Sequence, residues 1–289
     1  MNILVIGGNR LIGKHLVENL LNEKHNVTIA NRGLTPDDFG HKINRIILER
    51  TSEESIARAI GNNRYDIVYD SLAFSSNDVR CLLNVINCDK YIMTSTVSVY
   101  SPYMLNMYEK DFNPLNHSLK WRWRDDDVYS EVKRQAECAL YQKYSQIPSI
   151  AVRFPFVVGN DDYLRRLNFY AEHIAKQIPI FVDNVDEQMS FITSAEAGKF
   201  LAYLAAHEFE GKINASACGT ILMRDIISYI EQKTDKTAII SGDGVAAPYN
   251  GAKSHSMNLQ KAKDLGFEFS DVNSWFWDLL DDVIAATIA

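Results

Sequence analysis

Short runs of apolar residues recur along the first half of the chain, and each run is bounded by polar or turn-forming residues. Runs of this length that are rich in β-branched and aromatic residues are typical of strands buried on both faces of a sheet. The pattern predicts strands over residues 1–6, 26–30, 43–48, 66–69, 91–95 and 150–156.

Segments with helical periodicity separate these strands, over residues 12–24, 52–60, 77–86 and 129–144. A strand-helix-strand order repeated in this way predicts an α/β fold with a doubly wound parallel sheet. Ligands of such sheets bind beyond the carboxyl ends of the strands, so the residues that directly follow a strand are candidates for a site.

The pattern changes after Gly159 to longer helical segments, over residues 163–176, 194–207, 223–234, 259–265 and 273–286. We predict that residues 1–160 form the main sheet domain and that residues 161–289 form a smaller, helix-rich portion that shapes a substrate pocket. Single segments of this portion, such as KINASA at residues 212–217, can rejoin the main sheet.

The composition restricts the classes of function. The 289 residues carry a formal net charge of -7 without a Lys/Arg cluster, which argues against nucleic acid as a partner. The four cysteines and seven histidines lack metal-ligand spacing, so we expect reduced thiols and no metal site. No apolar run is long enough to span a bilayer, and the first residues do not resemble a signal peptide. We therefore expect a cytoplasmic protein that binds a small-molecule substrate and no membrane.

The first predicted strand is followed by GGNRLIG, residues 7–13, which opens a helix. In a dinucleotide-binding unit, one glycine forms the tight turn, a second lets the backbone approach the pyrophosphate, and a third lets the helix pack on the strand. Gly7 and Gly13 fill the outer roles, and Arg10 replaces the middle glycine. This context predicts dinucleotide binding. The alternative is a turn at a helix start whose glycines only permit a positive φ.

Two arginines bear on which dinucleotide binds. The guanidinium of Arg10 suits a terminal phosphate better than a buried pyrophosphate bridge. The second strand ends TIANRG, so Asn31 and Arg32 stand where a carboxylate would bind the adenosine 2'-hydroxyl. We predict NADP as the preferred cofactor, with NAD as the other choice. The alternative is that both arginines are solvated or ion-paired surface residues.

The spacing Tyr-x-x-x-Lys, which can form an acid/base pair, occurs three times. An ordinary tyrosine has a pKa of about 10, and a lysine one helical turn later favours the phenolate. The pairs at residues 229–233 and 249–253 lie in the carboxyl-terminal portion, far from the strand ends, and we interpret them as structural. Tyr129 and Lys133 begin a helix between two predicted strands, so this pair is the candidate.

The chain resembles the extended short-chain dehydrogenases/reductases, the NAD-dependent epimerase/dehydratase family, which have a Rossmann-type sheet. The similar segments are ILVIGGNRLIG, YDIVYDSLA, TSTVSVY, YSEVKRQAE, VRFPFVVG, MSFITSAEAGKFL and MNLQKAKDLGFEF, in this order. The resemblance implies that Tyr129 is the catalytic acid/base, that Lys133 tunes it and holds the nicotinamide ribose, and that Thr96 binds the substrate oxygen. It also implies a contact of Glu49 with the adenine amino group, and a homodimer as the expected assembly. The expected cofactor site consists of Gly7, Gly8, Asn9, Arg10, Leu11, Ile12, Gly13, Asn31, Arg32, Glu49, Arg50, Ser71, Leu72, Ala73 and Pro155.

Departures from the family pattern narrow the expected activity. Val97 and Ser98 stand where the sugar-nucleotide dehydratases carry the two carboxylic side chains that eliminate water, which disfavours dehydration. Phe156 replaces an asparagine that epimerases place near the substrate diphosphate. The remaining candidate anion partners are Arg165, Arg166 and Arg224. We expect an NAD(P)-dependent epimerase or reductase that transfers a hydride at a secondary alcohol or ketone carbon of a sugar-like substrate, nucleotide sugars included. The alternative is a catalytically silent protein of this fold that senses NAD(P) or binds RNA.

The segment KWRWRDDDVYS, residues 120–130, combines two tryptophans and two arginines with three aspartates just before the candidate tyrosine. The aspartates cancel the charge that a nucleic-acid surface needs, and consecutive residues point in different directions, which disfavours a metal site. We predict an ordered loop that flanks the site.

Overall fold

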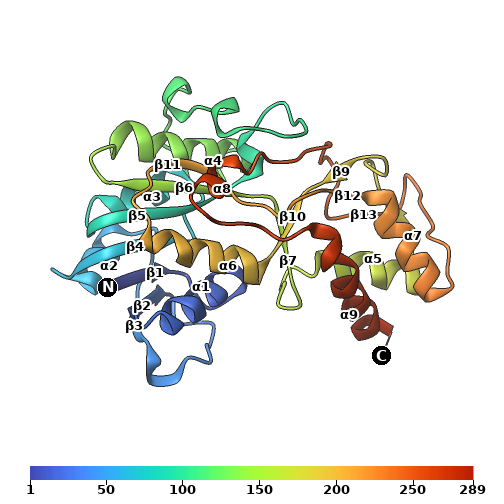
Figure 1. The fold of residues 1–289 in the computed structure, drawn as a ribbon, viewed down its shortest axis with the longest axis horizontal. Coiled ribbons are helices and arrows are strands. Elements are labelled where there is room, and N and C mark those ends of the chain that lie inside the picture. Colours follow the sequence, from blue (N-terminus) through green and yellow to red (C-terminus); the bar gives the residue numbers. More distant parts are fainter. Residues whose placement is uncertain (289) are drawn as a thin grey trace.

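The computed structural model of the chain describes residues 1–288. Its central sheet has seven strands, all paired in parallel, in the order β11-β6-β5-β4-β1-β2-β3 (Figure 1). Their bounds are β1 (Asn2–Ile6), β2 (Asn26–Asn31), β3 (Asn44–Ile47), β4 (Arg64–Asp70), β5 (Asn87–Thr96), β6 (Ser149–Phe154) and β11 (Gly211–Asn214). The predicted α/β class with a doubly wound, Rossmann-type sheet is confirmed.

Helices cover both faces of this sheet. They are α1 (Leu11–Asn22) and α6 (Ser194–Tyr203) on one face, and α2 (Glu53–Ile60), α3 (Ser76–Leu83) and α4 (Tyr129–Cys138) on the other. Ile3 and Val5 of β1 belong to the apolar layer under α1 and α6, whereas Leu4 and Ile6 belong to the opposite layer. Because successive side chains of a strand point to opposite faces, a sheet covered on both sides requires the continuous apolar runs seen in the sequence.

Helix α6 packs closely on α1, although the two are far apart in the sequence. A Cβ atom at Gly198 would lie 2.5 Å from the Cβ atom of His15 and 2.6 Å from the backbone nitrogen of Leu16. The missing side chain therefore allows this approach, and it attaches a helix from the second half of the chain to the sheet.

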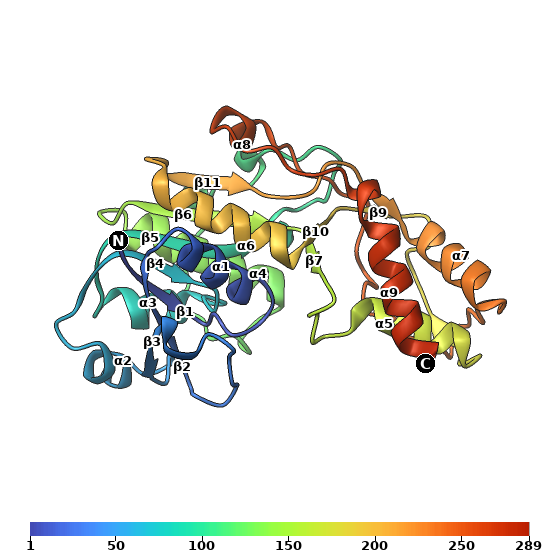
Figure 2. The same cartoon turned by 60° about the horizontal axis from the view of Figure 1, so that its bottom comes forward.

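A second body of structure lies beside the sheet (Figure 2). It contains α5 (Arg166–Ala175), α7 (Met223–Thr234) and α9 (Phe276–Ile288), with the short strands β8 (Ile180–Phe181), β9 (Gln188–Met189), β12 (Ile221–Leu222) and β13 (Val245–Ala246). Its side chains form a separate hydrophobic cluster that is rich in aromatic rings. We call this body the outer region, and the central sheet with its covering helices the sheet region.

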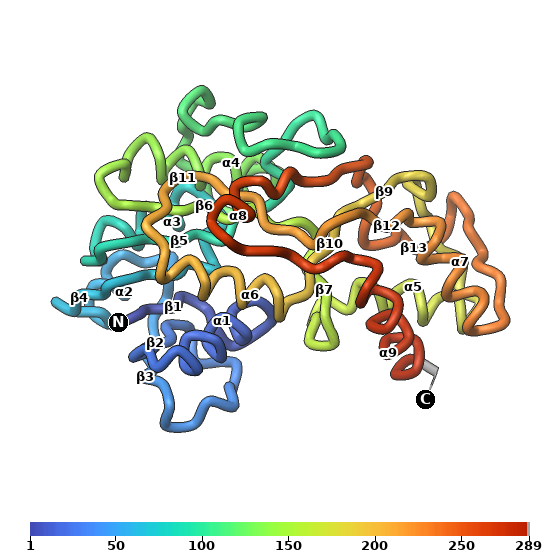
Figure 3. Tube along the Cα trace, viewed as in Figure 1, coloured from blue at the N-terminus to red at the C-terminus, as the bar shows by residue number. Residues whose placement is uncertain are grey.

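The chain crosses between the two regions more than once (Figure 3). Strands β7 (Phe156–Val158) and β10 (Phe191–Thr193) pair in parallel next to the end of β6. After β13 the chain returns to the sheet region as α8 (Gln260–Asp264), which contacts β11, and then enters α9. Elements beyond residue 160 thus pack with the sheet, as the sequence allowed for KINASA, and the division at residue 160 stays a prediction.

Some predicted bounds differ from the structure. Helix α4 ends at Cys138 and continues as the π-helix η5 (Ala139–Lys143), and α3 ends at Leu83 rather than at residue 86. The 3-10 helices are η1 (Gly40–Lys42), η2 (Val97–Val99), η3 (Glu109–Asp111), η4 (Pro114–Asn116), η6 (Leu204–Ala206) and η7 (Val272–Ser274). None of the helices within residues 1–288 combines the length and apolarity that crossing a membrane requires.

Candidate functional site

A cleft of about 880 Å³ opens at the carboxyl edge of the sheet, where residues that follow β1, β2, β3 and β4 meet. Most of the expected cofactor residues line it: Gly7, Gly8, Asn9, Arg10, Leu11, Ile12, Gly13, Asn31, Arg32, Glu49, Arg50, Ser71 and Leu72. Ala73 and Pro155, which the sequence also suggested, are buried outside this lining. The rule that ligand-binding residues follow strands therefore located the cleft.

The backbone of the glycine segment has the conformation that the sequence predicts. Gly7 and Gly8 have φ values of 100° and 97°, a region that disfavours residues with a side chain. A Cβ atom at Gly13 would lie 2.7 Å from the backbone nitrogen of Gly8, so α1 can start beside the loop only with glycine at this position. The first-turn amides of α1 are thereby placed next to the cleft.

Arg10 lies at the mouth of the cleft. Its guanidinium carbon is 5.1 Å from the ring centroid of Tyr163, a residue of the loop between β7 and α5. Both side chains are exposed, and both line the cleft. This stacking connects the glycine segment to the loop on the opposite side, and it leaves the guanidinium available to an anion in the cleft.

The end of β2 is tied to the glycine segment through two asparagines. The amide of Asn31 donates to Asn9 Oδ1 at 2.6 Å, and Asn31 Oδ1 accepts the backbone N–H of Gly33 at 2.7 Å. Arg32 is exposed in the cleft. Hydrogen bonds from Thr51 lower the pKa of Glu49, and the charge of Arg32 lowers it further. A carboxylate thus lies near Arg32 and offsets part of its charge.

Arg50 differs from its expected role. Although it lines the cleft, its guanidinium bonds the carboxylates of Asp70 and Asp78 at 2.5 and 2.9 Å and the carbonyl oxygen of Leu72 at 2.9 Å. Asp78 in turn accepts the backbone N–H groups of residues 74 and 75. Arg50 thus holds the loop after β4 in place, while its Nε has no partner among the described residues, and its contact with a cofactor stays a prediction.

Thr96 and Tyr129 meet at the same sheet edge. Thr96 is the last residue of β5, and Tyr129 is the first residue of α4. Tyr129 has 47% of its surface exposed, so its ring is open to a ligand. The surrounding protein nevertheless buries the phenol enough to raise its pKa, while hydrogen bonding by the Thr96 side chain and the charge of Arg124 lower it. Thr96 and Tyr129 thus lie near each other, and the catalytic roles expected of them stay a prediction.

Lys133 lies on the face of α4 that packs on the sheet. Its ammonium donates to the carbonyl oxygens of Ala73 and Thr94, each at 2.9 Å, and only 2% of the residue is exposed. Burial lowers the pKa of Lys133 to about 8, against the attraction of Asp70 and Asp78. Within the described residues no hydrogen bond joins Lys133 to Tyr129. The lysine bonds the loop after β4 and strand β5, and its predicted influence on the Tyr129 phenolate stays a prediction.

Phe74 lies between the cleft and the side chain of Lys133. Its ring lies 4.8 Å from Lys133 Nζ and 4.0 Å from the guanidinium carbon of Arg124. Phe74, Thr94 and Arg124 line the cleft, and Lys133 lies behind Phe74 and Thr94, outside the lining. Phe74 lies in the loop after β4, and Thr94 lies near the end of β5, so the rule that ligand-binding residues occur at the carboxyl ends of strands could have identified both. Nothing in the sequence indicated Tyr163. The lining also includes Trp123, Arg124 and Asp125, which confirms that the segment over residues 120–130 flanks the site.

A buried ion pair lies next to the elements that carry Thr96 and Tyr129. Arg153 of β6 and Glu137 of α4 are fully buried and 2.5 Å apart. Glu137 also accepts from Ser95 at 2.6 Å, and Arg153 donates to the Tyr100 hydroxyl at 3.0 Å. These bonds join α4, β5 and β6, the elements that carry or adjoin Thr96 and Tyr129.

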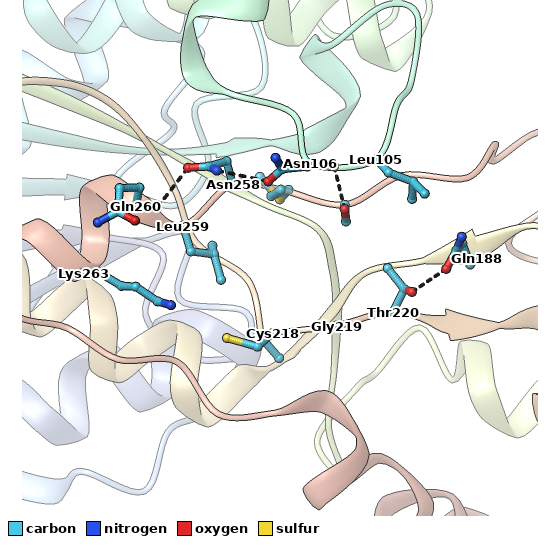
Figure 4. A pocket seen from close by; sticks show the side chains of 13 residues that line it. Leu105, Asn106, Gln188, Cys218, Gly219, Thr220, Asn258, Leu259, Gln260 and Lys263 are labelled. Carbon is cyan, nitrogen blue, oxygen red and sulfur yellow. Dashed lines mark hydrogen bonds between the residues drawn. The ribbon is translucent and has the colours of Figure 1, made fainter.

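A smaller hollow of about 400 Å³ lies apart from the cleft, between the loops around Asn106, Cys218 and Asn258 (Figure 4). Its polar side chains bond one another: Thr220 Oγ1 donates to Gln188 Oε1 at 2.7 Å, and the Asn258 amide donates to Asn106 Oδ1 at 3.0 Å. None of the residues expected to bind a cofactor or substrate lines it.

Comparison with known proteins agrees with the expected resemblance. The NAD dependent epimerase/dehydratase family matches residues 3–84. A 112-residue segment is 29% identical to the chloroplast stem-loop binding protein of 41 kDa b from Arabidopsis thaliana and covers 34% of this chain and 30% of that protein. A 103-residue segment is 26% identical to 2'-dehydrokanamycin reductase from Streptomyces kanamyceticus and covers 35% of this chain and 29% of that protein. The matched segments thus span less than a third of either relative.

The fold is shared with solved sugar epimerases. The UDP-glucose 4-epimerase of Thermus thermophilus, solved in complex with NAD, superimposes with a TM-score of 0.68 at 16% identity, over 93% of this chain and 94% of that one. At this level of identity the similarity shows the fold. The resemblance to the extended short-chain dehydrogenases/reductases is confirmed by the family match at the glycine segment together with this fold.

Proposed function

We propose that this chain, which matches the NAD-dependent epimerase/dehydratase family over residues 3–84 and has the fold of a sugar epimerase, transfers a hydride between a nicotinamide cofactor and a secondary alcohol or ketone carbon of a sugar-like substrate. The observation that carries this proposal is that three features lie at one sheet edge: the glycine-lined cleft, the ammonium of Lys133 against the lining residues Phe74 and Thr94, and Thr96 near Tyr129.

The cleft fits a dinucleotide. The absence of a side chain at Gly13 lets α1 start next to the loop, and the first-turn amides of that helix favour a pyrophosphate. The cofactor supplies or takes up the hydride at its nicotinamide ring. Residues of the glycine segment and of the loops after β2, β3 and β4 hold it, through backbone groups and the side chains of Arg10 and Arg32.

Tyr129 exchanges the proton of the substrate oxygen. Because burial raises its pKa, the phenol is protonated at neutral pH and can donate a proton to a carbonyl oxygen that is being reduced. The Thr96 hydroxyl bonds the same oxygen and fixes its position. In the reverse direction the phenolate of Tyr129 takes the proton from an alcohol that is being oxidised. A reductase uses only the reduction, whereas an epimerase uses both directions in one cycle.

Lys133 positions the reacting groups. An ammonium has three N–H donors, and two of them are given to the carbonyl oxygens of Ala73 and Thr94. The third is left for a hydroxyl of the nicotinamide ribose at the inner end of the cleft. Its positive charge also favours the phenolate of Tyr129 one helical turn away, once the phenol has lost its proton.

The test of the reaction is replacement of the phenol. Tyr129→Phe is expected to lower kcat by roughly 10²- to 10⁴-fold, the usual contribution of an acid/base group, with an unchanged Kd for NADPH. NADPH oxidation with 2'-dehydrokanamycin and interconversion of UDP-glucose are suitable assays because the relatives are named for these compounds. The matched control is Tyr229→Phe, which alters a second Tyr-x-x-x-Lys pair, in the outer region, and should not change turnover. A Tyr129→Phe variant with full turnover would contradict the proposal.

NADP is the proposed cofactor because Arg10 and Arg32 both face the cleft. Arg32→Ala is expected to reduce the preference for NADPH over NADH by about tenfold, which corresponds to one charge-assisted contact. Fluorescence titration of both reduced cofactors measures this ratio. A wild-type preference for NADH, or a ratio unaffected by Arg32→Ala, would show that Glu49 neutralises the arginine and that NAD is the natural cofactor. Whether the nucleotide copurifies tightly or exchanges freely separates an epimerase from a reductase.

A further inference from the structure

Two side chains extend from the catalytic phenol into the outer region. Burial raises the pKa of Tyr129, the phenol of Tyr103 raises it further, and the guanidinium of Arg166 lowers it, so both groups are near enough to Tyr129 for their charges to act on it. The ring centroid of His255 lies 5.2 Å from that of Tyr103, and the guanidinium carbon of Arg166 lies 5.9 Å from the centroid of Tyr249.

Phe156 contacts both His255 and Tyr249. Its ring centroid is 5.6 Å from that of His255 and 4.7 Å from that of Tyr249. Phe156 lies one residue beyond Pro155, which directly follows β6, at the sheet edge that also carries Thr96. The ring contacts therefore join Tyr103 to the outer region through Phe156, which lies two residues after Phe154, the partner of Thr96 in the sheet. We call these five side chains the substrate border: Tyr103, His255, Phe156, Tyr249 and Arg166.

The protonation of His255 follows from its bonds. His255 Nδ1 lies 2.8 Å from the carbonyl oxygen of Lys253, and a carbonyl oxygen can only accept, so Nδ1 carries the proton. Burial lowers the pKa of His255, so the ring is neutral at neutral pH. A neutral ring protonated at Nδ1 has a lone pair at Nε2.

Nε2 has no hydrogen-bond partner among the described residues, although His255 is only 1% exposed. Buried polar atoms are almost always bonded, and one that is left without a partner calls for an explanation. The His255 ring lies at a tilt to the ring of Tyr103 and at a steep angle to that of Phe156, with interplanar angles of 33° and 69°.

We infer that His255 Nε2 recognises the substrate by accepting a hydrogen bond from one of its hydroxyl or amino groups, while the rings of Tyr103 and Phe156 pack against the apolar face of the same molecule. This inference rests on the proposed function for the identity of the site, since Tyr129 marks where the reacting carbon lies. A site built around one buried acceptor discriminates strongly against analogues that lack the matching donor. The substrate class is thus a small polyhydroxyl or amino-substituted ring whose donor lies away from the reacting carbon.

The direct test is the side-chain nitrogen resonance of His255 in the NADP-bound protein. Two-dimensional ¹H–¹⁵N spectra are expected to show an unprotonated Nε2 in the absence of substrate. Methyl glucoside, UDP-glucose and kanamycin are the probes, and at least one should shift this resonance saturably. His207 is the internal control because its Nδ1 also lies 2.8 Å from a backbone carbonyl oxygen, that of Tyr203, outside the substrate border. A protonated Nε2, or an Nε2 signal that none of the three probes moves, would overturn the inference.

Two substitutions separate recognition from packing. His255→Phe keeps a ring but removes the acceptor, and it is expected to raise KM by about 10- to 100-fold with a small effect on kcat. His255→Gln restores an oxygen near the Nε2 position and should recover most of the loss. His207→Phe should leave KM unchanged. If the folded Gln variant, with a Tm near that of wild type, is as impaired as the Phe variant, His255 acts through packing and the inference fails.

The two proposals can fail separately. Turnover without a response of the His255 signal would leave the hydride transfer in place and remove His255 from recognition. A saturable His255 response with no turnover of any probe would support the binding site and remove the proposed reaction.

Discussion

The sheet region and the outer region each enclose a hydrophobic core, and a buried ion pair in the first differs from a buried phenol in the second in how its polar atoms are bonded. In the sheet region, the fully buried Arg153 and Glu137 pair with each other and with the hydroxyls of Ser95 and Tyr100. In the outer region, Tyr249 is equally buried, yet its hydroxyl has no partner among the described residues.

This difference corresponds to two tasks. Bonds that join β5, β6 and α4 hold together the elements that carry Thr96, Tyr129 and Lys133, and the roles proposed for these residues would need such a rigid support. Polar atoms without internal partners can bond a ligand at no cost to the protein's own hydrogen bonds. Under the proposed function, the Arg153–Glu137 network would hold the geometry for hydride transfer, and the unpartnered groups of the outer region would contact the substrate.

The largest expected effect comes from breaking the buried pair of the sheet region. Arg153→Met leaves the carboxylate of Glu137 buried without its partner, which is expected to lower the free energy of unfolding by about 3–5 kcal/mol. Urea unfolding followed by circular dichroism measures this change. Arg64→Met, which breaks an exposed pair with Asp89, is the control and should produce no measurable loss. An Arg153→Met variant as stable as wild type would show that the network does not support the sheet region.

The second expected effect is a pH dependence of the free energy of unfolding that comes from the buried Lys133. The pKa of Lys133 is lowered to about 8 in the folded protein, whereas an unfolded lysine titrates near 10.4. Between these values the unfolded chain binds more protons, so Lys133 makes the free energy of unfolding rise with pH, by roughly 3 kcal/mol in total. Lys133→Met should therefore flatten the stability profile from about pH 8 to pH 10.4 relative to wild type.

Lys233 is a control because its pKa shift, and hence its effect on the pH dependence of stability, has the opposite sign to that of Lys133. Its bond to Asp281 raises its pKa, so it stabilises the fold at lower pH and loses that contribution as the pH rises through the folded value. Lys233→Met should make the alkaline rise slightly steeper. Parallel profiles for wild type and Lys133→Met would mean that the lysine is hydrated in solution rather than held by the two carbonyl oxygens.

The two regions also differ in how well their strands could be predicted from the sequence. Strands of the sheet region are long apolar runs, and their ends carry Gly7, Asn31 and Glu49, so both the sheet and the cleft were predictable. Strands β8, β9, β12 and β13 have two residues each, too few for any periodicity, and none of them was predicted. Their pairing is decided by contacts that are distant in the sequence.

Tyr249 and Lys133 show where spacing alone fails. We interpreted Tyr249 as far from the strand ends, but pairing of β13 with β8 helps to bring its ring within 4.7 Å of Phe156, next to β6. The four-residue spacing correctly placed Lys133 on the same helix as Tyr129. It could not show that the long side chain reaches the carbonyl oxygens of Ala73 and Thr94, because these belong to two other elements.

The smallest expected effect sharpens the contrast most directly, because it removes one hydroxyl from each region. Tyr100→Phe leaves Asn214 Oδ1 and one N–H of Arg153 without a partner, which is expected to lower the free energy of unfolding by about 1–3 kcal/mol. Tyr249→Phe removes a buried hydroxyl that has no bond to lose, so stability should stay within about 0.5 kcal/mol of wild type or rise. Both values come from the same urea titrations. Equal losses would mean that the Tyr249 hydroxyl is bonded inside the protein, and the outer region would then hold one fewer free polar group for its ligand.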